Sequence, residues 1–113
     1  MLNRIIVEYN GKLLVVKENE IFYAFSNGAA VFLITTTGNL YSKYSLKELD
    51  AKLSKGNFIR THRSYIVNVN YVEEIKPLMN STLILKLKDK NNSEIPVSRY
   101  HTKKVREMFN KSK

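Results

Sequence analysis

Short segments of alternating apolar and polar residues, separated by turn residues, fill the first 43 positions of the chain. Residues 4–9 and 12–17 flank Asn10-Gly11, and both turn residues tolerate a positive φ, so this pair is a strong signal for a β-hairpin. Three more strands are expected in this region, at residues 20–26, 30–36 and 40–43. Turns at Asn27-Gly28 and at residues 37–39 separate them, and the five strands together predict an antiparallel meander.

A helical pattern begins at Ser45, which lies three residues before Glu48, the spacing of a capping box. A leucine stripe at helical spacing follows, at positions 46, 49 and 53. Gly56 stands where a helix commonly ends in a left-handed residue. The pattern predicts a helix from residue 46 to residue 55 that packs through its leucines.

The stretch of residues 57–70 changes character halfway along. Its first half carries Arg60, His62 and Arg63 and no acid, whereas residues 65–69 are β-branched and aromatic, the composition of a buried strand. A basic turn that leads directly into a buried strand is held rigidly, because the strand fixes the backbone that presents the side chains. We therefore expect this stretch to be the binding part of the molecule.

Three further strands are expected in the C-terminal half. Residues 71–76 form a strand that Pro77 ends, and residues 82–88 alternate between an apolar and a wet, basic face. The apolar face holds three leucines, Leu83, Leu85 and Leu87. Residues 93–97 predict a short strand, and Pro96 confines it to the edge or end of a sheet because proline donates no backbone hydrogen bond.

A second helix is expected from Arg99 onward, with an apolar side made of Tyr100, Val105, Met108 and Phe109. No linker, repeat or low-complexity segment interrupts the chain. The sequence therefore predicts one mainly β domain over residues 1–113, with two short helices.

Length and composition exclude several classes of protein. A chain of 113 residues can bury a core without disulfides or a structural metal, and it contains no cysteine. No apolar run is long enough to span a bilayer, and Arg4 and Glu8 interrupt any signal-peptide pattern. These features predict a soluble, cytoplasmic protein.

The charge is strongly positive and unevenly distributed. The sequence has 19 Lys and Arg against 10 Asp and Glu, a net charge of +9. Seven basic and 5 acidic residues precede Gly56, and 12 basic and 5 acidic residues follow it, so the excess is +2 before and +7 after. An excess that begins at the basic stretch favours a polyanionic partner, against the alternative of a basic surface without function.

Candidate catalytic residues do not form a recognisable set. Glu73 and Glu74 are adjacent in an expected strand and point to opposite faces, and His62 and His101 are far apart in the sequence. No metal-binding spacing or phosphate-cradling glycine loop is present. The sequence predicts no enzyme, no metal and no cofactor.

Two basic turns on a β scaffold favour nucleic-acid binding instead. Arginine suits bidentate contact with guanine, whereas lysine gives phosphate contacts without sequence preference. Alternatives remain at several positions: Arg60 can pair with Glu73 or Glu74, and His62 can bond a backbone carbonyl. Tyr65 and Tyr100 can be packing aromatics.

Two motifs carry a resemblance to a known family. Residues 58–68, FIRTHRSYIVN, and residues 95–100, IPVSRY, resemble the signature and closing motifs of the LytTR family of bacterial DNA-binding domains. Residues 21–23 and 45–49 stand at matching intervals, so the resemblance covers nearly the whole chain.

The resemblance implies stacked antiparallel sheets in a β sandwich whose loops enter successive major grooves of double-stranded DNA. It implies imperfect direct repeats at promoters, with the possibility of a second copy on the adjacent half-site. Base contacts are implied for Arg63, Arg99 and a third loop near residues 27–30, where only Asn27 has a side chain able to bond a base. Phosphate contacts are expected from the following residues: Arg60, His62, Ser64, Tyr100, Lys103 and Lys104.

The family usually follows a receiver domain in a response regulator of a two-component system. The 113 residues have no room for one, so the chain is expected to be a stand-alone member or the output domain of a longer regulator. An alternative from another class is a basic β module that binds an acidic protein or an anionic membrane surface. Single-stranded RNA is a weaker alternative, because no row of exposed aromatics alternates with the basic residues.

Overall fold

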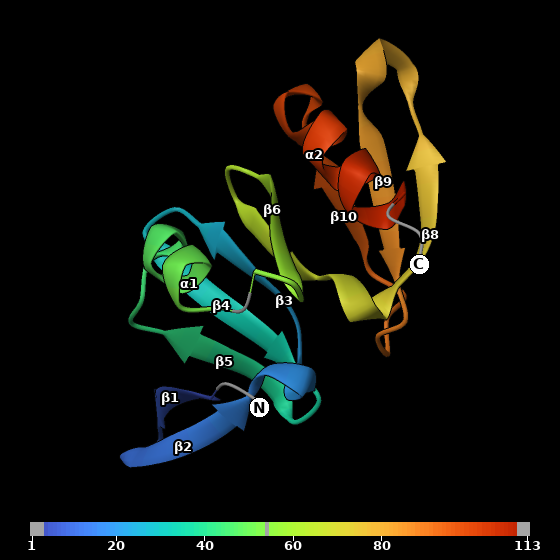
Figure 1. Ribbon diagram of the computed structural model, residues 1–113. Coiled ribbons are helices and arrows are strands. Elements are labelled where there is room, and N and C mark those ends of the chain that lie inside the picture. Colours follow the sequence, from blue (N-terminus) through green and yellow to red (C-terminus); the bar gives the residue numbers. More distant parts are fainter. Residues whose placement is uncertain (1–3, 54, 111–113) are drawn as a thin grey trace.

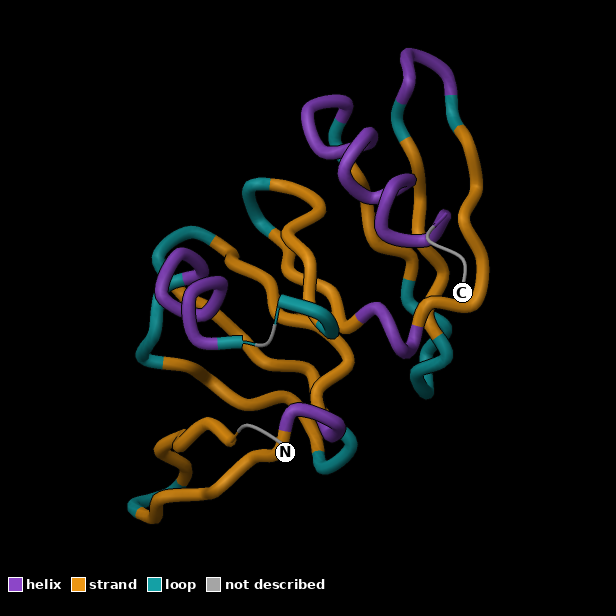
Figure 2. The backbone as a smooth tube through the Cα atoms, viewed as in Figure 1, coloured by secondary structure: helices purple, strands orange, loops and turns teal. Residues whose placement is uncertain are grey.

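The computed structural model describes residues 4–53 and 55–110, which form three antiparallel sheets and two helices (Figures 1 and 2). The elements are β1 (Arg4–Tyr9), β2 (Lys12–Lys17), β3 (Ile21–Asn27), β4 (Ala30–Thr35), β5 (Gly38–Ser42), α1 (Leu46–Lys52), β6 (Phe58–His62), β7 (Tyr65–Asn68), β8 (Val72–Pro77), β9 (Leu83–Leu87), β10 (Glu94–Val97) and α2 (Arg99–Asn110). The sheets have the orders β1-β2, β5-β4-β3-β7-β6 and β10-β9-β8. The predicted fold, mainly β with stacked antiparallel sheets and two helices, is confirmed.

The expected N-terminal meander is wrong in one respect, because β1 and β2 form a sheet of their own. The hairpin itself is as predicted: Tyr9 pairs with Lys12, and Asn10 and Gly11 have φ of 50° and 76°. Strand β3 pairs with β4 on one side and with β7 on the other, so β2 finds no free edge there. A single turn of 3-10 helix, Glu18–Glu20, carries the chain from one sheet to the other.

Helix α1 begins as predicted and ends three residues early. The amide of Glu48 donates to Ser45 Oγ at 3.1 Å and the amide of Ser45 donates to Glu48 Oε1 at 2.8 Å, which completes the capping box. The helix ends at Lys52 because Leu53 turns to an extended conformation, φ −82° and ψ 151°, and is buried in the core. The left-handed cap expected at Gly56 is therefore wrong, and Gly56 is not among the glycines with a positive φ.

The basic stretch expected to be a turn is largely a strand. Residues of β6 pair with β7, and only Arg63 and Ser64 form the turn between them. The polar residues Arg60, Thr61 and His62 concealed the strand in the sequence, although Thr61 is fully buried. The binding turn is therefore narrower than residues 60–64.

Two hydrophobic cores share the β6–β7 hairpin as a common wall. Phe58 and Ile66 pack into the core formed with α1 and the β1–β2 hairpin. Their neighbours Ile59 and Val67 pack into the core formed with β9, β10 and α2. Burial on both faces fixes the position of this hairpin and of the turn at its end.

The C-terminal region has the predicted strands, with one helix face assigned wrongly. Leu83, Leu85 and Leu87 are buried, and Pro96 lies in the edge strand β10, as expected. Val105 is also buried in α2, and the partly buried Met108 and Phe109 pack on the same core.

Tyr100 does not belong to the apolar side of α2, because 90% of it is exposed. Thr102 takes its place in the buried stripe, three residues before Val105 and seven before Phe109, the spacing of one helix face. The Thr102 hydroxyl donates to the Ser98 carbonyl at 3.1 Å and the Ser81 carbonyl at 2.8 Å, which satisfies it in this buried position.

Candidate nucleic-acid interface

Two backbone hydrogen bonds bring three loops from distant parts of the chain to one edge of the molecule. The amide of Ser26 donates to the carbonyl of Ser64 at 3.0 Å, which joins the β3–β4 turn to the β6–β7 turn. The amide of Ser98 donates to the carbonyl of Thr61 at 2.9 Å, which joins the start of α2 to β6. The three loops consequently follow one another along a single edge (Figures 1 and 2).

The β6–β7 turn is braced by the side chains that flank it. Arg60 donates from Nε to the His62 carbonyl at 2.9 Å and from Nη2 to the Arg63 carbonyl at 2.6 Å. The amide of Ser64 donates to Nδ1 of His62 at 3.0 Å, and the His62 ring meets Tyr65 edge-on, with centroids 5.7 Å apart. The turn thus has a fixed shape, and Arg63 at its tip is exposed to solvent.

The two alternatives considered for Arg60 and His62 are not what the structure shows. Arg60 forms no ion pair with Glu73 or Glu74 among the described residues, because its guanidinium bonds the turn carbonyls instead. His62 accepts a hydrogen bond from a backbone amide rather than donating one to a carbonyl through Nδ1. Tyr65 is a partly buried packing aromatic, whereas Tyr100 is not.

A shallow basic groove lies between the β6–β7 turn and the first turns of α2. It is lined by Asp50, Arg60, Arg63, Tyr100, His101 and Lys104. The lining holds three permanent cations and one carboxylate, and Lys104 and Tyr100 are exposed. Such a groove attracts an anionic ligand.

His101 is the titratable residue whose protonation the groove opposes. Burial lowers its pKa below the ordinary value, and the positive charges of Arg60 and Lys104 act in the same direction, against a smaller opposite effect of Asp50. Its Nδ1 lies 2.7 Å from Ser98 Oγ, so the ring is held in place at the start of α2.

The β3–β4 turn completes the edge. Asn27 is exposed, and Gly28 has a φ of +65° with open space where a Cβ would stand. A second groove, lined in part by Gly28, Ala29 and Arg63, connects this turn to the β6–β7 turn. Arg63 therefore lines both grooves and stands between the other two loops.

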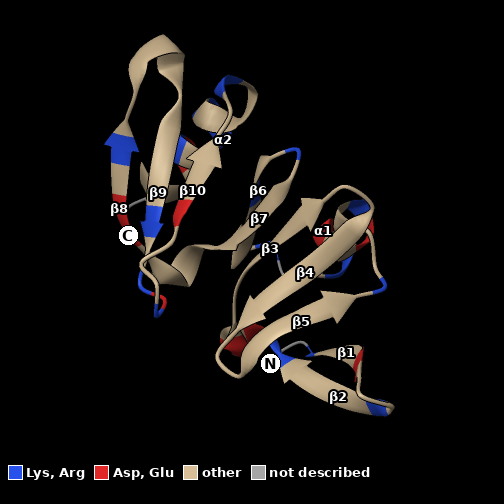
Figure 3. Ribbon diagram, turned by 180° about the vertical axis from the view of Figure 1, so that it is seen from behind, with Lys and Arg blue, Asp and Glu red and all other residues tan. Residues whose placement is uncertain are grey.

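The remaining predicted residues lie at the same edge. Arg99 and Lys103 are exposed in the first two turns of α2, and Ser64 is partly buried in the β6–β7 turn. Figure 3 shows basic residues at the β6–β7 turn and near the start of α2. The structure thus brings together all nine predicted contact residues, although their assignment to bases or phosphates stays a prediction.

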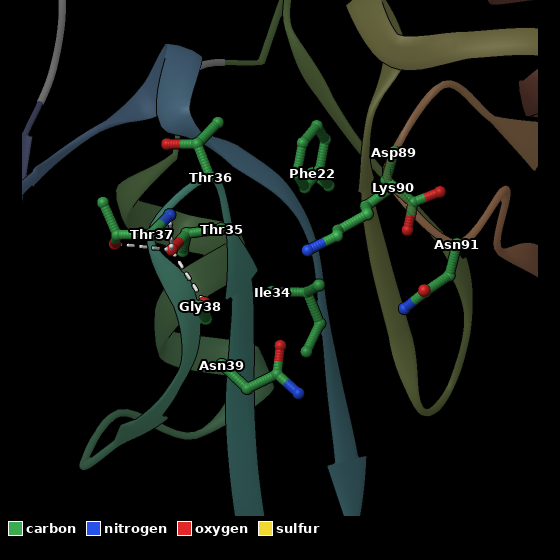
Figure 4. A pocket seen from close by; sticks show the side chains of 10 residues that line it. All are labelled: Phe22, Ile34, Thr35, Thr36, Thr37, Gly38, Asn39, Asp89, Lys90 and Asn91. Carbon is green, nitrogen blue, oxygen red and sulfur yellow. Dashed lines mark hydrogen bonds between the residues drawn. The ribbon is translucent and has the colours of Figure 1, made fainter.

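A pocket elsewhere shows no catalytic arrangement. It lies between the β4–β5 turn and the β9–β10 turn (Figure 4), and two of its polar side chains bond residues of their own turns. Thr35 Oγ1 donates to the Gly38 carbonyl at 2.8 Å, and Asp89 accepts from the amide and hydroxyl of Ser93 at 2.7 and 2.5 Å. Within residues 4–53 and 55–110, no cluster of metal-ligating side chains occurs and no helix is long and apolar enough to cross a membrane.

Sequence reasoning missed two features of this edge. Asp50 of α1 lines the basic groove, and the β8–β9 turn is tied to α2 through the bond from Thr102 to Ser81. No local motif marks either one, since both arise from contacts between segments far apart in the chain.

A mainly β domain that presents exposed basic residues at the β6–β7 turn and at the start of α2, along one edge, has the features of a DNA-binding domain. Comparison with known families agrees, because residues 11–110 match the model of the LytTr DNA-binding domain. The chain belongs to this family.

Individual relatives show the same relationship. The chain is 36% identical over 98 residues to the transcriptional regulatory protein YpdB of Escherichia coli, and 37% identical over 99 residues to the sensory transduction protein LytT of Oceanobacillus iheyensis. Each match covers 87% of this chain and 40% of the relative, so the chain spans less than half the length of these regulators.

A solved structure agrees with the fold. The LytTr DNA-binding domain of a response regulator from Bacillus cereus superimposes with a TM-score of 0.85 at 28% identity. The match covers 96% of this chain and 97% of that one, so the two domains share their architecture from end to end.

Proposed function

We propose that this chain binds double-stranded DNA in a sequence-specific manner and thereby regulates transcription. The observation that carries the proposal is the pair of backbone hydrogen bonds, Ser26 to Ser64 and Ser98 to Thr61, that aligns three loops with exposed basic or amide side chains on one edge. Membership of a family of DNA-binding domains and similarity to named transcriptional regulators support it.

Arg63 and Arg99 are the proposed base-reading residues, with Asn27 as the third. Both arginines are exposed, and a guanidinium can bond O6 and N7 of guanine together. Asn27 can bond an adenine edge in the same bidentate manner. The open space around Gly28 lets the β3–β4 turn approach the duplex closely.

The proposed phosphate contacts fall into two groups. Lys103, Lys104 and Tyr100 project from the exposed part of α2 and can reach phosphates directly. Arg60, His62 and Ser64 hold the β6–β7 turn in shape and add donors beside it. Arg60 therefore serves two purposes, because its bonds to two carbonyls leave N–H donors available.

The size of the molecule suits a short DNA segment. Its longest extent is 44 Å, slightly more than one turn of B-DNA at roughly 34 Å. One copy can therefore reach successive grooves on one side of the duplex, and a longer promoter site would hold two copies on direct repeats. In a longer cytoplasmic regulator, a receiver domain would control the binding of two copies to the direct repeats.

Selection from a random pool of DNA duplexes tests this proposal. We expect recovery of a repeated half-site containing guanines, bound by the chain at physiological salt more tightly than random duplex by a factor on the order of 10³ or more. Recovery of no common sequence, or binding that duplex DNA cannot displace from an acidic protein or from anionic vesicles, would reject it.

A further inference from the structure

The turn between β8 and β9 presents two large apolar side chains to solvent. Met79 is 83% exposed and Leu78 is 50% exposed, and the rest of the turn, Asn80, Ser81 and Thr82, is polar and uncharged. A lone exposed apolar side chain needs no explanation, but two of them at the tip of a projecting hairpin form a small apolar point.

The turn holds these side chains in a fixed orientation. The amide of Leu78 donates to the carbonyl of Thr82 at 2.9 Å, and the Thr82 hydroxyl donates to the carbonyl of Met79 at 3.0 Å. Asn80 and Ser81 both adopt left-handed conformations, with φ of 63° and 61°. Consecutive left-handed residues without glycine are unfavourable, so the hydrogen bonds must hold the shape of the turn.

The turn that carries the apolar point is hydrogen-bonded to the start of α2, where Arg99, a proposed base contact, lies. Thr102, in the first turn of α2, donates its hydroxyl to the Ser81 carbonyl at 2.8 Å. The same hydroxyl reaches the Ser98 carbonyl, next to Arg99. The β8–β9 turn and the start of α2 are therefore joined by a hydrogen bond, and the tip extends the row of loops beyond α2 (Figures 1 and 2).

We propose that Met79, supported by Leu78, is an apolar wedge that enters the minor groove beside the segment contacted by Arg99 and bends the duplex. This inference rests on the proposed DNA-binding function. Met and Leu are among the side chains that unstack base steps in architectural DNA-binding proteins, where the bend lets the duplex follow more of the protein surface.

The position of the side chain beside the basic edge favours DNA over another protein as its partner. A methionine side chain is unbranched and polarisable, so it adapts to the gap between two bases. The apolar point lies at one end of a basic edge that would already hold the duplex, so the wedge acts on bound DNA. The step it enters is expected to be pyrimidine–purine, since TA and CA/TG steps kink most easily.

The test uses the duplex recovered by selection, labelled with a donor and an acceptor at its ends and carrying 2-aminopurine at the step beside the Arg99 contact. We expect the wild-type chain to shorten the end-to-end distance and to raise 2-aminopurine fluorescence. Met79→Ala should lose most of both changes and bind about five- to tenfold more weakly, whereas Met79→Leu should retain them. Leu13→Ala, which removes a 70% exposed leucine from β2, is the matched control and should behave as wild type.

The outcomes separate the two proposals. If the wild-type chain binds the selected duplex but Met79→Ala bends and unstacks it equally, the wedge is refuted and the DNA-binding function stands. Binding of the selected duplex by the wild-type chain without any bend would refute the wedge in the same way. If the wild-type chain selects no duplex, both proposals fail together.

Discussion

Individual side chains at the edge differ in how many hydrogen bonds they make within the protein. Arg60 and His62 are committed to the β6–β7 turn through three hydrogen bonds. Arg63 is exposed at the tip of the β6–β7 turn, and Arg99 is exposed at the start of α2. An arginine that is exposed on a braced loop loses less conformational freedom on binding than one on a mobile loop, so its contacts translate more fully into affinity.

Arg99→Ala should weaken binding to the selected duplex by about 1 to 3 kcal/mol and change binding to random DNA much less, because a bidentate contact with guanine distinguishes sequences. Fluorescence anisotropy titrations with both duplexes measure the difference. Arg4→Ala removes the same charge from β1 and serves as the control. Equal weakening on both duplexes would mean that Arg99 acts only through its charge.

The lowered pKa of His101 predicts a pH dependence of DNA affinity. Burial and neighbouring cations lower the pKa of His101 and so favour the neutral ring in the free protein, whereas a DNA phosphate in the groove would favour the protonated ring. Binding then takes up a proton, so the affinity should rise as the pH falls from about 8 to about 6, by at most roughly tenfold per pH unit. His101→Gln should flatten this profile, and a profile unchanged by the substitution would exclude His101 as its source.

At the scale of elements, the sequence correctly predicted the features that are fixed by interactions between neighbouring residues. The Asn10-Gly11 hairpin and the Ser45–Glu48 capping box have the expected geometry, because both are fixed within a few residues. Three predictions were wrong: the end of α1, the burial of Tyr100, and the extent of the basic turn, most of which is strand β6. Each depends on which core a side chain enters, and that is set by residues distant in the sequence.

Helix α1 offers a stability test at this scale. Ser45→Ala removes the side chain that accepts from the Glu48 amide and should cost about 1 kcal/mol of unfolding free energy. That loss corresponds to a decrease in Tm of about 4 to 8 °C for a domain of this size. Lys47→Ala, an exposed substitution in the same helix, is the control, and equal melting temperatures for the two variants would show that the cap contributes nothing.

At the scale of the whole molecule, the effect of the net charge of +9 depends on where the basic residues lie. Six of the nine candidate contact residues were predicted from two motifs, one central and one near the C-terminus, and a resemblance to a family supplied their roles. What the sequence could not show is the contact between the motifs, because the hydrogen bond from Ser98 to Thr61 joins residues 37 positions apart. The groove that results, which includes Asp50, is lined by residues from several segments that come together only in the folded protein.

Placement of charge predicts which lysines control salt dependence. Lys103→Ala should reduce the slope of log affinity against log salt concentration by about 0.9, because one fewer counterion is released on binding. Lys12→Ala, at the start of β2 and away from the candidate interface, should leave the slope unchanged. Titrations from about 50 to 200 mM salt measure it, and equal slopes for Lys103→Ala and wild type would remove Lys103 from the phosphate contacts.

The β6–β7 hairpin, which is shared by the two hydrophobic cores, also determines how the molecule unfolds. Ile66 and Val67 are both fully buried, one in each core, so neither core can open without exposing the strand that closes the other. The two halves should therefore melt together in one cooperative transition, and the amides of β7 should be among the slowest to exchange with solvent. The β6–β7 turn of the candidate interface leads directly into β7, so it should stay assembled when less protected segments open locally.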